Sequence, residues 1–260
     1  MSLPFELARF GHRRFGGIAD LIARLAAAVA PESGPPSWPT PETLDSLFRA
    51  ELAVAGVRLV SAAKTKTQYH SDGTIDIASL YEVRIAQGRE VASRPRNAHD
   101  LLNALMWVAF PRAKWALSQR LAELQTARAR GARSLPVART RAHDRLALLD
   151  EGGIVCTRAG QWVFGHAIYE HAYHGRHDIR AAMFVVEGEV VIPGAPAVTA
   201  SRSGFPSGTA ARAARAAADA ALAARIADDA VLAGALQRGA GQAVDDDALC
   251  VVPVRVEAPD

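Results

Sequence analysis

Apolar residues recur at helical spacing along much of this 260-residue chain. Residues 1–30 show an amphipathic helical pattern, and a proline-rich stretch at 31–41 separates them from a second predicted helix over about 40–56. The most apolar segment is 97–110, where hydrophobic side chains cover nearly every side of the predicted helix. A helix of this kind is normally buried, so the segment is expected to lie in the core.

Shorter patterns predict the other elements. Strands are expected at 57–60, 79–86, 154–157, 182–186, 189–192 and 250–256. Helices are expected at 112–128, 161–174 and 207–239, a turn is expected at 150–153, and 144–149 fits either a strand or a helix. Together these elements indicate an α+β fold, helix-dominated, with a small sheet of short strands. We expect residues 1–204 to form the core domain, with the alanine-rich helix and edge segment of 205–260 packed on it.

Composition excludes few function classes. The net charge is +3 with a pI of about 9.1, which does not demand a nucleic-acid partner, and no nucleic-acid motif is present. Two cysteines, Cys156 and Cys250, are too few for a disulfide framework and lack metal-ligand spacing. No apolar run approaches the length of a membrane span, so we expect a cytoplasmic protein without a membrane partner.

The apolar helix at 97–110 carries a polar arc. Asn97 is a good N-cap, and Asp100 lies in the first turn, where a carboxylate is favoured. His99, Asp100 and Asn103 share one side of the helix, and buried polar groups need partners. Two interpretations stay open: a hydrogen-bond network in the core, or a cleft floor that presents these three residues as catalytic groups.

A second helix, at 161–174, also carries chemically capable residues. His166 and Glu170 lie four residues apart on one face, a spacing that can hold a divalent metal cofactor. Arg94, Lys114 and Arg141 could then face a small anionic ligand such as a phosphate-containing substrate. The alternative is that Glu170 simply hydrogen-bonds to His166 within the core. In either case we expect the two polar helices to pack together, with His99 close to His166.

Four motifs, taken in order, resemble one bacterial family. They are Tyr81-Glu-x-Arg84-Ile, then Arg94-x-x-Asn-x-His-Asp-x-x-Asn-Ala-x-x-Trp-x-x-Phe-Pro-x-x-Lys114, then Leu149-Asp-Glu-x-Gly153, and finally Phe164-Gly-His-Ala-x-Tyr-Glu170. Over about residues 45–200 the chain is similar to the family called domain of unknown function 3025. It departs from the family pattern at Ala98, where the family often has Trp, and in its tail. The resemblance implies a shared fold and a shared polar site, and no activity.

Three function classes therefore remain. The first is a metal-assisted hydrolase that uses His99, Asp100, His166 and Glu170 on an anionic substrate. The second is an anion-binding module built on Arg94, Lys114 and Arg141, and the third is a non-catalytic protein whose polar motif is a core network. No G-x-S-x-G elbow and no glycine-rich phosphate loop is present, so nucleophilic-serine and nucleotide-binding schemes lack support.

Overall fold

The computed structural model describes residues 5–30, 36–62, 66–135, 140–157, 160–176, 179–186, 208–228 and 251–256. Its helices are the 3-10 turns η1 (Leu7–Gly11), η2 (Arg13–Ile18) and η3 (Ile77–Ser79), and the α-helices α1 (Ala19–Val29), α2 (Pro41–Leu47), α3 (Arg49–Ala53), α4 (Tyr81–Gly88), α5 (Ala98–Ala109), α6 (Pro111–Ala129), α7 (Arg141–Gly152), α8 (His166–Tyr173) and α9 (Gly208–Ala227). Its strands are β1 (Arg58–Ser61), β2 (Glu90–Ser93), β3 (Gly153–Thr157), β4 (Gly160–Val163), β5 (Ile179–Val185) and β6 (Val251–Val256). The predicted helix-dominated α+β class is confirmed. Among these described helices, none combines the length and the apolar character needed to cross a membrane.

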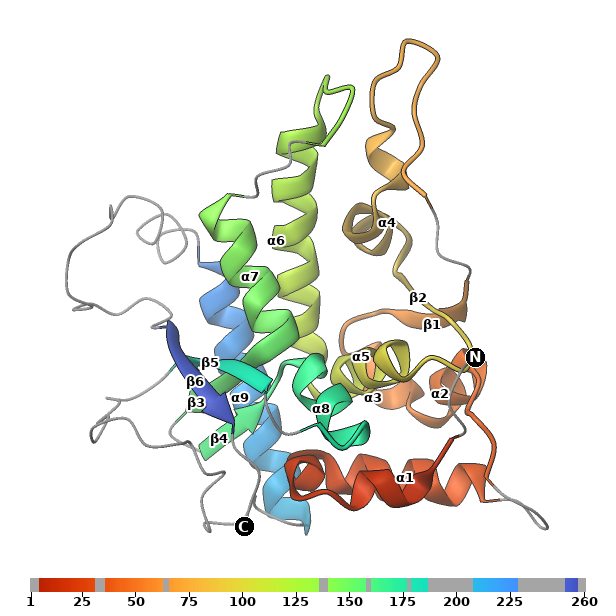
Figure 1. Cartoon of the computed structure of the whole chain (residues 1–260), viewed down its shortest axis with the longest axis vertical. Helices are drawn as coiled ribbons and strands as arrows, with labels where there is room; N and C mark the ends of the chain where they lie inside the picture. Colours follow the sequence, from red (N-terminus) through yellow and green to blue (C-terminus); the bar gives the residue numbers. More distant parts are fainter. Residues whose placement is uncertain are drawn as a thin grey trace.

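Helix α5 lies in the middle of the molecule, with α8 beside it (Figure 1). The Asn97 side chain accepts a hydrogen bond from the Asp100 amide at 3.0 Å, which caps the start of α5 as predicted. Pro111 then takes the first position of α6, where its missing N–H costs nothing. Eight residues of α5 are buried, so its apolar surface belongs to the core on several sides.

The strands form two small sheets. β1 and β2 pair in parallel, and the second sheet has the order β4-β3-β5-β6. In it β3 and β5 are parallel, while β4 and β6 run antiparallel to their neighbours. The predicted edge strand at 250–256 is therefore confirmed as β6, whereas the strand predicted at 189–192 lies outside the described residues.

The strand predicted at 79–86 is wrong. This stretch forms the end of η3 and most of α4. Leu80, Val83 and Ala86 are spaced three residues apart, and in the structure they pack together against Ala122 and Ala129 of α6. The apparent alternation was too loose to distinguish a strand from this helical spacing.

The boundaries around α7 and α8 also differ from the predicted ones. The turn expected at 150–153 is the last turn of α7, and the helix expected from 161 starts only at His166, after β4. A Cβ on Gly165 would lie 2.5 Å from the Glu151 carbonyl oxygen, closer than packing allows. Glycine here thus lets the start of α8 approach the end of α7, while the Phe164 and Gly165 amides both donate to the Gly153 carbonyl.

Helix α9 is built into the core. Leu222 and Ile226 are fully buried, and Asp219 accepts hydrogen bonds from the Arg112 and Ala113 amides at the start of α6. The helix predicted to reach 239 is described only to 227. The domain boundary at 204 stays a prediction.

Candidate functional site

Asp100 binds Arg94 and holds the segment that leads into α5. Its carboxylate accepts three hydrogen bonds from Arg94, at 2.7 Å from the backbone amide, 2.8 Å from Nε and 2.7 Å from Nη2. Burial alone would raise the pKa of Asp100, but these bonds to Arg94 hold it below its usual value. This pair fixes the approach of the chain to α5 and leaves Asp100 ionised.

His99 stands between two partners from α8. Its Nδ1 lies 2.9 Å from Oε2 of Glu170, and its Nε2 lies 3.2 Å from Nε2 of His166. The hydrogen bond to Glu170 raises the pKa of His99, and the same bond lowers the pKa of Glu170. The expectation that the two polar helices pack together, with these histidines close, is confirmed.

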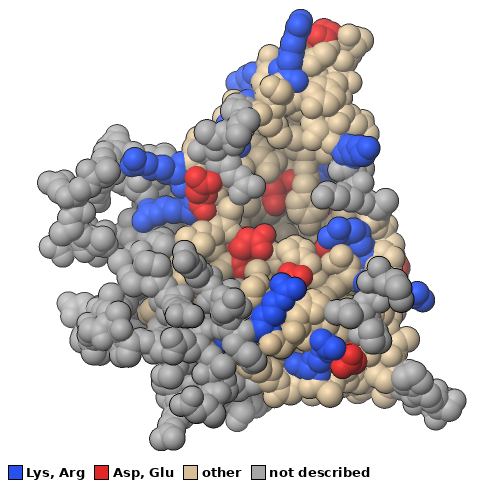
Figure 2. Space-filling model, viewed as in Figure 1, with Lys and Arg blue, Asp and Glu red and all other residues tan. Residues whose placement is uncertain are grey.

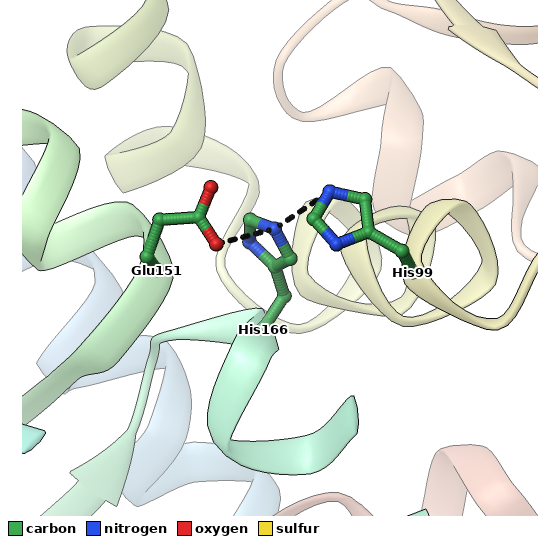
Figure 3. A group of neighbouring side chains, drawn as sticks. All are labelled: His99, Glu151 and His166. Atoms are coloured by element: carbon green, nitrogen blue, oxygen red, sulfur yellow. Dashed lines mark hydrogen bonds and ion pairs between the residues drawn. The ribbon is translucent and has the colours of Figure 1, made fainter. Parts of the chain in front are cut away.

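His166 is buried and faces a second carboxylate. Its Nε2 lies 3.3 Å from Oε2 of Glu151, which stands at the end of α7, so His166 sits between Glu151 and His99 (Figure 3). One ligand atom from each of these three residues lies within 4.8 Å of the others. Burial lowers the pKa of His166, which favours a neutral ring.

The other ring nitrogen of His166 is unsatisfied. Its Nδ1 is buried without a hydrogen-bond partner among the described residues. Oδ1 of Asp150 lies 4.0 Å from this nitrogen, beyond hydrogen-bond distance. A buried ring nitrogen without a hydrogen-bond partner costs free energy, so the cluster is not a fully satisfied core network.

The ammonium group of Lys114 is buried beside Asp150. Lys114, only 4% exposed, donates to Oδ1 of Asn103 at 2.8 Å and forms a short ion pair with Asp150. Burial would raise the pKa of Asp150, but the charge of Lys114 holds it below its usual value. Asn103 therefore orients Lys114, and both belong to the support of the site.

The His99–Glu151–His166 cluster and Asp150 line a cavity of about 350 Å³. Its polar wall includes Arg94, His99, Asp150, Glu151 and His166, and Tyr81 and Glu82 of α4 close another side. In Figure 2, acidic side chains surround the hollow at the centre of the face. Arg94, which lines the cavity, and Lys114, which pairs with the lining residue Asp150, are each bound to a carboxylate, so they do not offer the free positive charge expected of an anion site.

The sequence-predicted residues meet here with one exception. His99, Asp100, Asn103, Arg94, Lys114, His166 and Glu170 all belong to this connected group. Arg141 begins α7, ten residues before Glu151 and thus about 15 Å away along the helix. It is not among the described residues that line the cavity.

Sequence reasoning missed four titratable residues of the cavity. Tyr81 and Glu82 were assigned to a strand, and Asp150 and Glu151 to a turn. All four stand in motifs quoted for the family resemblance, which was the available signal. Glu170 was expected as a metal ligand, and this stays a prediction; in the structure its Oε2 lies 2.9 Å from Nδ1 of His99.

Residues 68–162 match the model of a family described as a protein of unknown function (DUF3025). This finding confirms the family resemblance over that stretch, and the match ends just before His166. No curated protein and no solved structure matches the chain significantly.

Proposed function

We propose that the chain is a metal-assisted hydrolase whose divalent ion is held by Nε2 of His99, Nε2 of His166 and an oxygen of Glu151. The observation that carries the proposal is the convergence of these three atoms at the wall of a cavity. Two histidines and a carboxylate, with a further position left for water, form a known type of catalytic zinc site.

The spacing of the ligand atoms supports an ion between them. Metal–nitrogen bonds of about 2.0–2.1 Å place two ligands of one ion roughly 3.0–3.4 Å apart. The His99–His166 and His166–Glu151 separations are 3.2 and 3.3 Å. All three ligand atoms lie within 4.8 Å of one another, and an ion would bind among them.

The surroundings of the two rings support the same arrangement. Glu170 accepts from Nδ1 of His99, which directs Nε2 toward the cluster. Asp150 lies 4.0 Å from Nδ1 of His166 and is the candidate for the same role there. A carboxylate behind each histidine is the usual support of metal-bound imidazole.

A bound ion would supply both a nucleophile and positive charge. Divalent metals lower the pKa of a coordinated water and polarise a phosphoryl or carbonyl oxygen. Since Arg94 and Lys114 are already paired, a phosphate-containing substrate would bind chiefly through the ion.

Metal binding is the first expected result. Mn²⁺ or Zn²⁺ should raise the melting temperature of the wild type, corresponding to about 2.7 kcal/mol at a free metal concentration one hundred times Kd. His166→Ala should abolish this shift. Glu170→Gln should weaken metal affinity roughly 10–100-fold, because it disturbs a partner of His99 rather than a ligand. Thermal unfolding with and without metal measures all three.

His70→Ala is the matched control, because His70 is exposed and is not among the described residues that line the cavity. It should leave the metal response unchanged. Absence of any metal response in the wild type, together with strong destabilisation in His166→Ala, would favour the core-network alternative.

Phosphate binding separates the hydrolase from a metal-free anion-binding module. Inorganic phosphate is expected to bind the Mn²⁺-loaded protein and not the metal-free protein, because Asp100 and Asp150 already neutralise Arg94 and Lys114. Calorimetric titration of both forms measures this difference. Phosphate binding without metal that is lost in Arg94→Gln would support the anion-binding module instead.

A further inference from the structure

Glu82 carries a carboxyl group that lines the cavity and is not part of the His99–Glu151–His166 cluster. It lies in the first turn of α4 and forms part of the cavity wall. The hydroxyl of Ser118, on α6, donates to its Oε2 at 2.6 Å. The side chain is thus held in one place at the cavity wall.

The charged groups facing Glu82 do not neutralise it. From α6 it faces Lys114, whose ammonium is already bound to Asn103 and Asp150. From α7 it faces the like charge of Asp150, and its neighbour on α4 is the phenol of Tyr81. No ion pair to Glu82 is found within the described residues. Burial raises the pKa of Glu82 to about 7.

We propose that Glu82 is the catalytic acid of this cavity and gives its proton to the leaving group of the substrate. The inference rests on the proposed hydrolase function. A cavity of about 350 Å³ is small enough for one substrate to touch both the His99–Glu151–His166 cluster and Glu82.

The proton balance of the step is simple. The oxygen of water forms a bond to the phosphorus as the bond from phosphorus to the leaving oxygen breaks. Glu82 transfers its proton to that leaving oxygen, which departs as a neutral alcohol. The water loses one proton, which restores the acid form of Glu82, so nothing besides water is consumed.

The test compares two leaving groups on the Mn²⁺-loaded protein. Phenyl phosphate needs a proton on its poor leaving group, whereas 4-nitrophenyl phosphate releases a stable anion. Glu82→Gln should lower kcat/KM for phenyl phosphate about 100-fold or more and for 4-nitrophenyl phosphate less than about tenfold. The wild-type rate with phenyl phosphate should fall above about pH 7, and this fall should be absent in the variant.

Glu123→Gln, an exposed change on α6, is the control and should leave both rates unchanged. Equal losses on both substrates, no loss on either, or a loss of Mn²⁺ affinity in Glu82→Gln would each overturn the role of Glu82 while the hydrolase stands. Absence of hydrolysis by the Mn²⁺-loaded wild type would overturn both proposals.

Discussion

Lys114→Met should lower the free energy of unfolding by about 3–5 kcal/mol, the usual cost of removing one partner of a buried ion pair. The methionine keeps most of the apolar stem, so the loss reports the ammonium rather than the packing. Asp150, whose Oδ1 lies 4.0 Å from Nδ1 of His166, would be left without its cation. Urea unfolding at pH 7 measures the change.

A second substitution distinguishes charge from volume. Lys114→Met combined with Asp150→Asn removes both charges and should recover at least half of the lost stability, since no buried charge is then uncompensated. Arg120→Met on the same helix removes a pair with the exposed Glu123 and should cost less than about 1 kcal/mol. Additive losses in the double variant would show that Lys114 and Asp150 do not depend on each other.

Glu82→Gln should stabilise the protein at pH 8 by on the order of 3 kcal/mol relative to the wild type, and by almost nothing at pH 4. The folded protein raises the pKa of Glu82 to about 7, from about 4.3 in an unfolded chain. Its contribution to stability is fully present below the unfolded pKa and is lost as the pH rises through the folded pKa. Glutamine stays neutral throughout and still accepts from Ser118.

The measurement is the difference in unfolding free energy between variant and wild type at several pH values between 4 and 8. Taking this difference cancels the titration of groups that both proteins share. The stabilisation should grow mainly between about pH 4 and 7. A difference that does not change with pH would show that Glu82 ionises in the folded protein as it does in the unfolded chain.

The central helix was predictable because its signals are local. The cap at Asn97, the proline at 111 and the unbroken apolar surface between them act within a few residues of one another. The polar arc of the same helix directed attention to His99. The need of buried polar groups for partners then predicted His166, which is far away in sequence.

The remaining site residues depend on tertiary contacts that sequence does not display. Glu151 reaches His166 only because α7 continues through what resembled a turn, and because Gly165 permits a close backbone approach. Glu82 faces the cavity only because α4 packs as a helix on α6. Glu170 was placed correctly near the histidines, but which of its neighbours it binds is set by the packing of α8 on α5.

The ligand atoms of the cluster come from three separate helices, α5, α7 and α8, and its two histidines are 67 residues apart in the chain. An ion held there would therefore act as a removable cross-link that closes a long loop. In the unfolded chain the same closure would carry a large entropic penalty, so the ion would bind chiefly after the three helices have docked. Local opening of any of the three helices would break the cross-link, and the backbone amides of α5, α7 and α8 would then share one metal-dependent protection from hydrogen exchange.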